Sequence, residues 1–81
     1  MKVTIKFNYG LGNLIENYNS EMGIILELNH KENIKSIITR HFSKNIVNNT
    51  GIVMANKKLA NLDYCVNCGD MIEIFPILGG G

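Results

Sequence analysis

The sequence has little of several features that mark other classes of protein. Its 81 residues include no tryptophan, one proline and two cysteines. The two cysteines are too few and too close together for the disulfide framework of a small secreted domain. No apolar run approaches the ~18–20 residues of a membrane span, and no apolar signal segment precedes the first alternating residues. The sequence therefore predicts a cytoplasmic protein that does not enter a membrane.

The chain also lacks a strong charge of either sign. Eight lysine and arginine residues stand against seven aspartate and glutamate residues, and the longest basic run is Lys57-Lys58. A nucleic-acid-binding domain usually gathers its basic residues in one stripe, so nucleic acid is not an expected partner. A chain this short buries only ~60–65% of the surface that it exposes when unfolded, which leaves no room for a deep catalytic pocket. Function is expected on the surface, at a terminus or in a site shared with a partner, and not as an enzyme.

Alternation of apolar and polar residues predicts two strands near the N-terminus. Val3, Ile5 and Phe7 alternate with polar residues, which is the pattern of a half-buried strand. A second strand is expected at about residues 23–28, after a long loop rich in asparagine and glycine. The two strands are expected to pair antiparallel.

One helix is expected in the middle of the chain. Asn29 resembles a helix N-cap, because Glu32 follows three residues later and can return its side chain to the backbone N–H of the cap. Apolar residues recur at helical spacing from Ile34 to Phe42. The sequence therefore predicts a helix over about residues 31–43.

Two further strands are expected after the helix. One covers residues 52–55 and is followed by a polar turn, beneath which Leu59 and Leu62 are expected to pack. The last covers residues 71–75 and is expected to end at Pro76, because proline has no backbone N–H for a sheet ladder. Asp70, just before it, is expected to accept backbone N–H groups in a turn.

The order strand, strand, helix, strand, strand predicts an α+β fold. A single helix with one apolar stripe fits across one face of a mixed four- or five-stranded sheet. In such a layout the first and last strands often lie parallel at the centre. Residues 1–78 are expected to form this one domain, and residues 79–81 a flexible glycine tail.

The C-terminal residues are the strongest candidate for a functional site. Three consecutive glycines, Gly79–Gly81, end the sequence. Glycines bury no side chain and lose the most backbone entropy when ordered, so they do not serve to stabilise the fold. They can enter a tunnel too narrow for any Cβ and carry a terminal carboxylate deep into another protein. A partner is expected to bind the residues just before them, which are Phe75, Pro76, Ile77 and Leu78.

A frayed terminus or a remnant of cloning is the alternative interpretation of these glycines. Their setting favours a functional tail, because they directly follow a strand, a proline and two aliphatic residues. The reactive group would then be a carboxylate that becomes reactive once ATP converts it to an acyl-adenylate.

The ending of the chain resembles that of the ubiquitin-like sulfur carriers. In that family a Gly-Asp turn leads into an apolar strand, a proline, two small or aliphatic residues and Gly-Gly, as it does here from Asn67 to Gly80. The family includes the small subunit of molybdopterin synthase and the sulfur carrier of thiazole formation, and the resemblance implies their β-grasp fold. Phe75-Pro76 resembles the molybdopterin type more closely, although that type often has a second proline where this chain has Ile77.

The resemblance implies a carrier cycle, with no cofactor or metal bound to the chain itself. An E1-like enzyme would use ATP to adenylate the C-terminal carboxylate. A sulfur donor (a cysteine desulfurase or a rhodanese-type protein) would convert it to a thiocarboxylate, which a synthase subunit of molybdopterin or thiamin-thiazole biosynthesis would receive. Gly79 and Gly80 match the family's Gly-Gly pair. Gly81 is then either the activated residue, as we expect, or an extra residue that is trimmed.

Two other functions fit the same ending. As a ubiquitin-like modifier, the chain would be joined through its activated carboxylate to lysines of other proteins. As a plain interaction module, it would bind a partner and its tail would be inert.

Cys65 and Cys68 form a C-x-x-C pair that the carrier cycle does not use. With His30 or His41 they could bind zinc, or they could form a redox couple or a persulfide relay. A zinc site normally takes four ligands, and the redox motif usually opens a helix, whereas this pair precedes a turn. The favoured interpretation is that one cysteine packs inward and the other is a loop thiol without a role. His41 is expected at the boundary of the helix and His30 in solvent.

Overall fold

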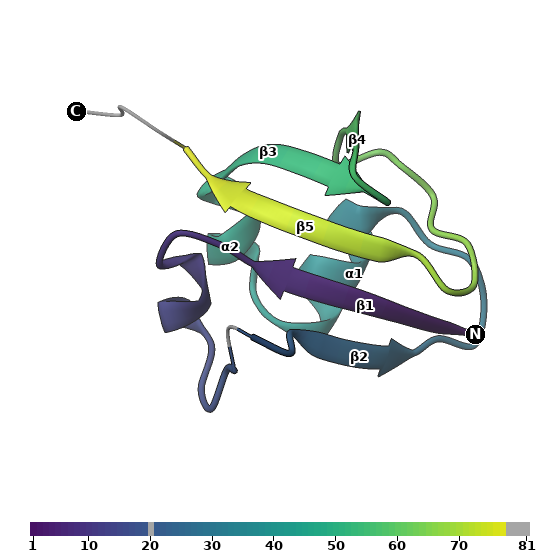
Figure 1. Ribbon diagram of the computed structural model, residues 1–81, viewed down its shortest axis with the longest axis horizontal. Helices are drawn as coiled ribbons and strands as arrows, with labels where there is room; N and C mark the ends of the chain where they lie inside the picture. Colours follow the sequence, from purple (N-terminus) through teal and green to yellow (C-terminus); the bar gives the residue numbers. More distant parts are fainter. Residues whose placement is uncertain (20, 78–81) are drawn as a thin grey trace.

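The computed structural model describes residues 1–19 and 21–77. Within these residues five strands form one mixed sheet, accompanied by two α-helices and one 3₁₀ helix (Figure 1). The strands are β1 (Lys2–Phe7), β2 (Ile24–Glu27), β3 (Thr50–Ala55), β4 (Lys58–Ala60) and β5 (Met71–Pro76). The helices are η1 (Leu11–Leu14), α1 (Ile34–His41) and α2 (Lys44–Asn48). The expected tail at residues 79–81 lies outside the described residues.

The sheet has the strand order β2-β1-β5-β3-β4. β1 and β5 are parallel neighbours at its centre, and the other neighbouring strands pair antiparallel. Helices α1 and α2 lie on one side of the sheet, behind it in Figure 1. The parallel central pair, the antiparallel pairing of the first two strands and the α+β class confirm the predictions from the sequence.

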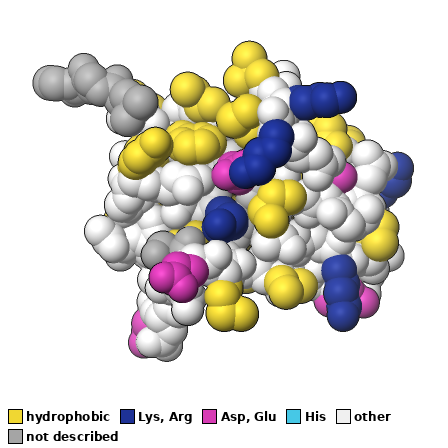
Figure 2. All heavy atoms as spheres, in the orientation of Figure 1, with side chains coloured by type: hydrophobic (Ala, Val, Ile, Leu, Met, Phe, Trp, Pro, Cys, Tyr) yellow, Lys and Arg dark blue, Asp and Glu magenta, His cyan; other side chains and the backbone are white. Residues whose placement is uncertain are grey.

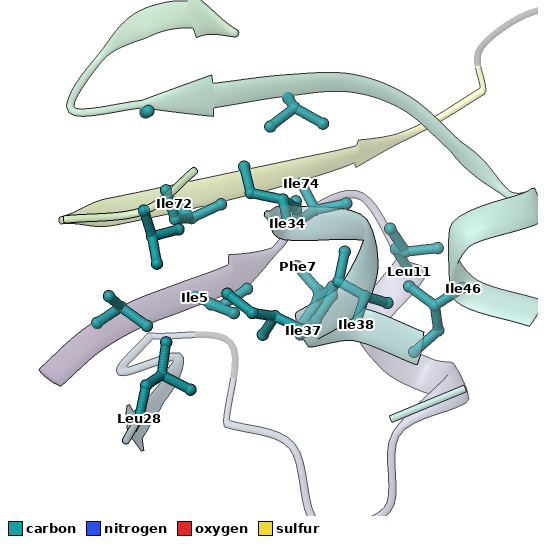
Figure 3. Packing of buried hydrophobic residues seen from close by; sticks show 14 residues of the cluster. Ile5, Phe7, Leu11, Leu28, Ile34, Ile37, Ile38, Ile46, Ile72 and Ile74 are labelled. Atoms are coloured by element: carbon teal, nitrogen blue, oxygen red, sulfur yellow. The ribbon is translucent and has the colours of Figure 1, made fainter. Parts of the chain in front are cut away.

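The core lies between the sheet and the helices. It is almost entirely aliphatic, and Figure 3 shows how its side chains interdigitate: Ile5, Phe7, Ile72 and Ile74 come from the strands, Ile34, Ile37 and Ile38 from α1, and Leu11 and Ile46 close one end. Because α1 and α2 cover one face of the sheet, the opposite face is left to solvent. No helix in the described ranges combines the length and the apolar character needed to cross a membrane.

The helix begins later than the sequence predicts, and its N-cap is Asn33 rather than Asn29. The side-chain oxygen of Asn33 accepts a hydrogen bond from the backbone N–H of Ser36 at 2.8 Å. Asn29 is exposed and lies outside the helix. The predicted position of the cap was therefore wrong by about one helical turn.

Backbone pairing explains why no capping box forms at Asn29. The carbonyl of Glu32 accepts the N–H of Val66 at 3.0 Å, and Asn33 forms an isolated β-bridge with Cys65. These contacts hold Glu32 and Asn33 beside a later segment and keep them out of the helix. The side chain of Glu32 pairs with Arg40 instead of returning to a cap.

The predicted helix also extended too far, because α1 ends at His41 and Phe42 is its C-cap. A second short helix, α2, follows, and the hydroxyl of its N-cap, Ser43, accepts the N–H of Ile46 at 3.4 Å. A helix of five residues is too short to show a helical repeat of apolar residues, so the sequence pattern missed it.

The turn after β3 leads into β4, a strand that the sequence pattern missed. The two residues of this turn, Asn56 and Lys57, both have positive φ, 54° and 69°, as in a tight two-residue hairpin. Pairing of Met54 with Leu59 turns the Leu59 side chain to the solvent face of the sheet, where it is 78% exposed. The expectation that Leu59 packs beneath the turn was therefore wrong, whereas Leu62 is partly buried and packs against the core.

Candidate functional site

The face of the sheet opposite the helices carries apolar side chains in solvent. Ile25, Ile52 and Leu59 are 65%, 44% and 78% exposed. Successive side chains of a strand point to opposite faces of the sheet. Ile52, for example, points outward because the next residue, Val53, points into the core. Strand register brings the outward residues of all five strands together. We name this surface the open face and define it by Ile25, Ile52, Met54, Leu59, Met71 and Phe75.

Figure 2 views the molecule from the open face. Hydrophobic side chains gather there, above all over β3, β4 and the end of β5, and charged side chains lie between them. One charged pair within this surface is Lys57 and Glu73, whose Nζ and Oε1 atoms are 3.1 Å apart. An exposed apolar patch interspersed with polar groups is typical of a surface that binds another protein.

Tyr9 extends the open face at the end of β1. Its ring lies against that of Phe75, with ring centroids 5.7 Å apart, and the residue is 75% exposed. Its φ of 52° lies in the left-handed region, which is uncommon for a residue with a side chain and costs about 1–3 kcal/mol. The backbone thus holds an aromatic ring in solvent beside the C-terminal end of β5. Aromatic residues of this kind often anchor a protein interface.

The chain leaves the sheet next to Tyr9 and Phe75. β5 ends at Pro76, as predicted. Pro76 is half-buried, and Ile77 is 56% exposed. We name Pro76 and Ile77 the stem. The backbone N–H of Ile77 donates to the carbonyl of Asn49 at 2.9 Å, so the stem is still bonded to the fold beyond the last strand.

The stem therefore begins at the end of the strand that contributes Phe75 to the open face. Three of the residues expected to bind a partner, Phe75, Pro76 and Ile77, follow one another at the C-terminal end of the central strand β5. The fourth, Leu78, and the expected reactive residues Gly79, Gly80 and Gly81 lie outside the described residues.

A buried carboxylate fixes the turn before β5. Asp70 is 7% exposed and accepts three hydrogen bonds: from the Nδ2 of Asn56 at 2.9 Å, and from the hydroxyl of Tyr64 and the N–H of Asn67 at 2.8 Å each. Burial alone would raise the pKa of Asp70. The three hydrogen bonds and the charge of Lys31 outweigh it and hold the pKa below its usual value.

This arrangement gives Asp70 a structural role. The hydrogen bond that it accepts from the N–H of Asn67 confirms the prediction that Asp70 accepts a backbone N–H. The pKa of Tyr64 is raised, mainly by its hydrogen bond to Asp70 and secondly by burial. The carboxylate ties together the hairpin of β3 and β4, the loop before the turn and the start of β5. It therefore supports the strand that carries the stem.

Cys65 and Cys68 are both exposed, and the residue that packs inward between them is Val66. The expectation that one of the two cysteines is buried was wrong, because the bridge to Asn33 turns Val66 and not Cys65 toward the core. His30 and His41 are exposed as well. Among the described residues, no three His, Cys, Asp or Glu side chains lie close enough together to hold a metal ion.

Sequence reasoning missed several residues of the candidate site. Tyr9 falls in the loop expected after the first strand, and no sequence pattern assigns a role to Asn49. Ile52 and Leu59 were expected to be ordinary strand or core residues. An apolar residue at an outward position is visible only once the strand register is known.

The comparisons with known proteins concern the fold. No protein-family model matches the chain, and no curated protein matches it in sequence. Among solved structures, the chain is similar to the crystal structure of SAMP1 from Haloferax volcanii, with a TM-score of 0.67, 14% identity and 100% of both chains covered. It is also similar to a "Putative molybdopterin converting factor, subunit 1" from Pyrococcus furiosus, with a TM-score of 0.70, 16% identity and coverage of 96% of this chain and 99% of that one. At these identities the likeness establishes the fold: the chain has the β-grasp fold of ubiquitin-like proteins, as expected from the resemblance of its ending.

Proposed function

We propose that the chain is a sulfur carrier whose reactive group is the C-terminal carboxylate of Gly81. The open face and the stem dock on partner proteins, and the glycines carry the carboxylate into a partner's active site. The observation that supports this most directly is the position of Ile77. It is exposed, it directly follows the central strand of the sheet, and it lies next to an apolar surface.

This arrangement suits a carrier because the surface that binds partners is separate from the group that reacts. The apolar side chains of the open face supply binding energy, while three glycines without side chains supply access. The similarity in fold to a protein described as a molybdopterin converting factor subunit agrees with this division. The partners would be an E1-like activating enzyme, a sulfur donor of the desulfurase or rhodanese type, and a receiving synthase subunit.

Two chemical steps would charge the carrier. In the first, a carboxylate oxygen of Gly81 attacks the α-phosphorus of ATP, the bond between the α- and β-phosphates breaks, and pyrophosphate leaves. In the second, hydrosulfide attacks the carbonyl carbon, the bond to the AMP oxygen breaks, and AMP leaves with its electron pair. The product is a thiocarboxylate, and neither step oxidises or reduces the chain. ATP binds to the activating enzyme, so the chain itself needs no cofactor.

Mass spectrometry of the intact chain tests this proposal. The chain is incubated with a cognate activating enzyme, ATP and hydrosulfide, and the expected product has one oxygen replaced by sulfur at Gly81. Omission of ATP and deletion of Gly80 and Gly81 are the controls, and both should leave the mass unchanged. The same spectrum measures whether the native chain ends at Gly81 or at Gly80. If no exchange occurs with any cognate activating enzyme, the proposal is wrong.

Protein modification is a second candidate function, favoured by the similarity in fold to SAMP1, a ubiquitin-like protein. The same acyl-adenylate can be attacked by an amine, and a lysine would then be joined to Gly81 by an isopeptide bond. An immunoblot of native cell extract separates the two functions. A ladder of heavier conjugates that disappears when Gly80 and Gly81 are deleted supports the modifier, and a single band at the size of the free chain supports the carrier.

A further inference from the structure

The segment before β3 makes an unusually close contact with the stem. The pairing of β3 with β5 shifts register between Thr50 and Ile52, so Gly51 forms a bulge opposite Pro76. A Cβ on Gly51 would lie 2.7 Å from the carbonyl oxygen of Pro76 and 2.9 Å from the Cα of Ile77. Both atoms belong to the backbone, so the stem would have to move to admit any side chain.

The backbone conformation at Gly51 does not explain why this residue is a glycine. The glycines with positive φ in the described residues are Gly10, Gly23 and Gly69, and Gly51 is not among them. The φ of Gly51 is outside the left-handed region, so what excludes a larger residue is the approach of the stem. Gly51 is therefore a site of close backbone contact and not a turn residue.

The same segment bonds the stem to helix α2. The carbonyl of Asn49 accepts the N–H of Ile77 at 2.9 Å, and the N–H of Asn49 donates to the carbonyls of Asn45 and Ile46 at 3.2 and 3.1 Å. The hydroxyl of Thr50 donates to the carbonyl of Ile46 at 2.8 Å. Ile46 is 1% exposed, so this chain of bonds leads from the stem directly into the core.

We propose that Asn49, Thr50 and Gly51 form a clamp that fixes the position and direction in which the stem leaves the fold. The clamp makes Ile77 a fixed pivot for the residues that follow. Four residues follow Ile77, and an extended chain of four residues spans at most ~13–14 Å. The clamp therefore sets how deep the carboxylate of Gly81 reaches into an activating enzyme that holds the open face. Gly51 is a positioning residue in this reaction, since it does not touch the reacting atoms.

Stability alone does not account for the clamp. Ile77 lies beyond the last strand pair and is mostly exposed, so its backbone hydrogen bond to Asn49 adds little to the stability of the fold. Its effect on the position of a short tail is larger, because a misplacement of about 1 Å at a reacting group can slow a reaction on the order of 100-fold. This inference rests on the proposed function, since it assigns a role in that reaction.

Steady-state adenylation kinetics with the cognate activating enzyme test the clamp. Gly51→Ala should lower kcat by about 10- to 100-fold and leave the KM for the carrier within about threefold, because the open face is unchanged. Ile37→Val in α1 is the control: it removes a buried methylene far from the stem, lowers the melting temperature and should leave kcat unchanged. A Gly51→Ala chain that is folded and adenylated at the wild-type kcat would overturn the clamp.

A second variant keeps the test sharp if Gly51→Ala does not fold. One glycine inserted between Leu78 and Gly79 leaves the fold intact and moves the carboxylate by up to ~3.5 Å. A fixed pivot predicts a fall in kcat of about 10-fold or more at constant KM, and wild-type kinetics would contradict it. The proposed function is judged separately, on the wild-type chain. If that chain is never adenylated, both the function and the clamp are wrong, whereas a normal wild-type chain with normal variants removes the clamp alone.

Discussion

The side-chain amide of Asn56 donates a hydrogen bond to the carboxylate of Asp70 at 2.9 Å, across 14 residues of sequence. The same amide accepts the N–H of Met71 through its oxygen, and the backbone N–H of Asn56 donates to the carbonyl of Met71 at 2.8 Å. Asn56 therefore joins the hairpin of β3 and β4 to the first residue of β5. The strand that carries the stem is held at its start by this junction and at its end by Asn49.

Asp70→Asn should destabilise the fold and weaken its dependence on acid. The pKa of Asp70 is lower in the folded chain than in the unfolded one, so the unfolded chain binds the proton first as the pH falls. The stabilising effect of the carboxylate is thus complete above an unfolded pKa of about 3.9 and is lost as the pH falls through the lower folded pKa. The variant should lose about 1–3 kcal/mol at pH 7, because one donor in the cluster loses its acceptor.

Urea unfolding of the wild type and the variant from pH 7 down to about pH 2 measures this effect. The difference between their unfolding free energies should shrink below about pH 4. Asp63→Asn is the matched control, since Asp63 is exposed, and it should follow the wild type at every pH. A constant difference between Asp70→Asn and the wild type would show that the charge of Asp70 is not what stabilises the junction.

Substitutions of Asn33 and Asn29 should distinguish the observed start of the helix from the predicted one. Asn33→Ala should lower the unfolding free energy by about 1 kcal/mol, because the N–H of Ser36 loses its side-chain acceptor. Asn29→Ala should change it by less than about 0.5 kcal/mol, as expected for an exposed residue without such a bond. Thermal unfolding of both variants measures the difference. A larger loss for Asn29→Ala would mean that the helix begins at the earlier cap.

The sequence was sufficient to predict the elements that bury one face. Val3, Ile5 and Phe7 alternate because β1 has the core on one side only, and Ile34, Ile37 and Ile38 repeat at helical spacing for the same reason. The central parallel pair followed from the order of the elements. These features depend on local periodicity, which a single sequence contains.

The remaining elements depend on contacts between distant residues. The helix start was set by the bridge between Asn33 and Cys65, which no local pattern contains. β4 has three residues and no periodicity of its own, and Asn56-Lys57 is a hairpin turn without the glycine that usually marks one. The open face could not be assembled from the sequence, since Ile52 and Leu59 look like core residues until pairing turns them outward.

Charge on the open face should weaken docking without changing the chemistry. Leu59→Glu or Ile52→Glu adds a charge that must be desolvated in an apolar interface, so each should raise the KM for the carrier in adenylation about 10-fold or more. kcat should stay near the wild-type value, in contrast to the clamp variants. Thr39→Glu adds the same charge at an exposed position of α1, on the other side of the sheet, and should leave both constants unchanged. An unchanged KM in both open-face variants would mean that the activating enzyme binds elsewhere.

Removal of Gly81 should distinguish the two possible ends of the tail. The shortened chain reaches ~3.5 Å less far, so its rate of ATP-dependent pyrophosphate release should fall about 10-fold or more if Gly81 is the activated residue. A rate equal to or above that of the full chain would instead make Gly80 the working end. Addition of a tryptophan after Gly81 serves as the control, and it should abolish activation in either case.

The central position of β5 would have a mechanical consequence if the end of the chain is held by enzymes, as proposed above. A pull on the stem runs along β5, whose hydrogen bonds to β1 and β3 lie across the direction of the strand. Such a load strains many of these bonds at once, whereas a strand at the edge of a sheet can be peeled away one bond at a time. The domain can therefore stay folded while the proposed carrier is pulled away from an enzyme that holds its C-terminal end.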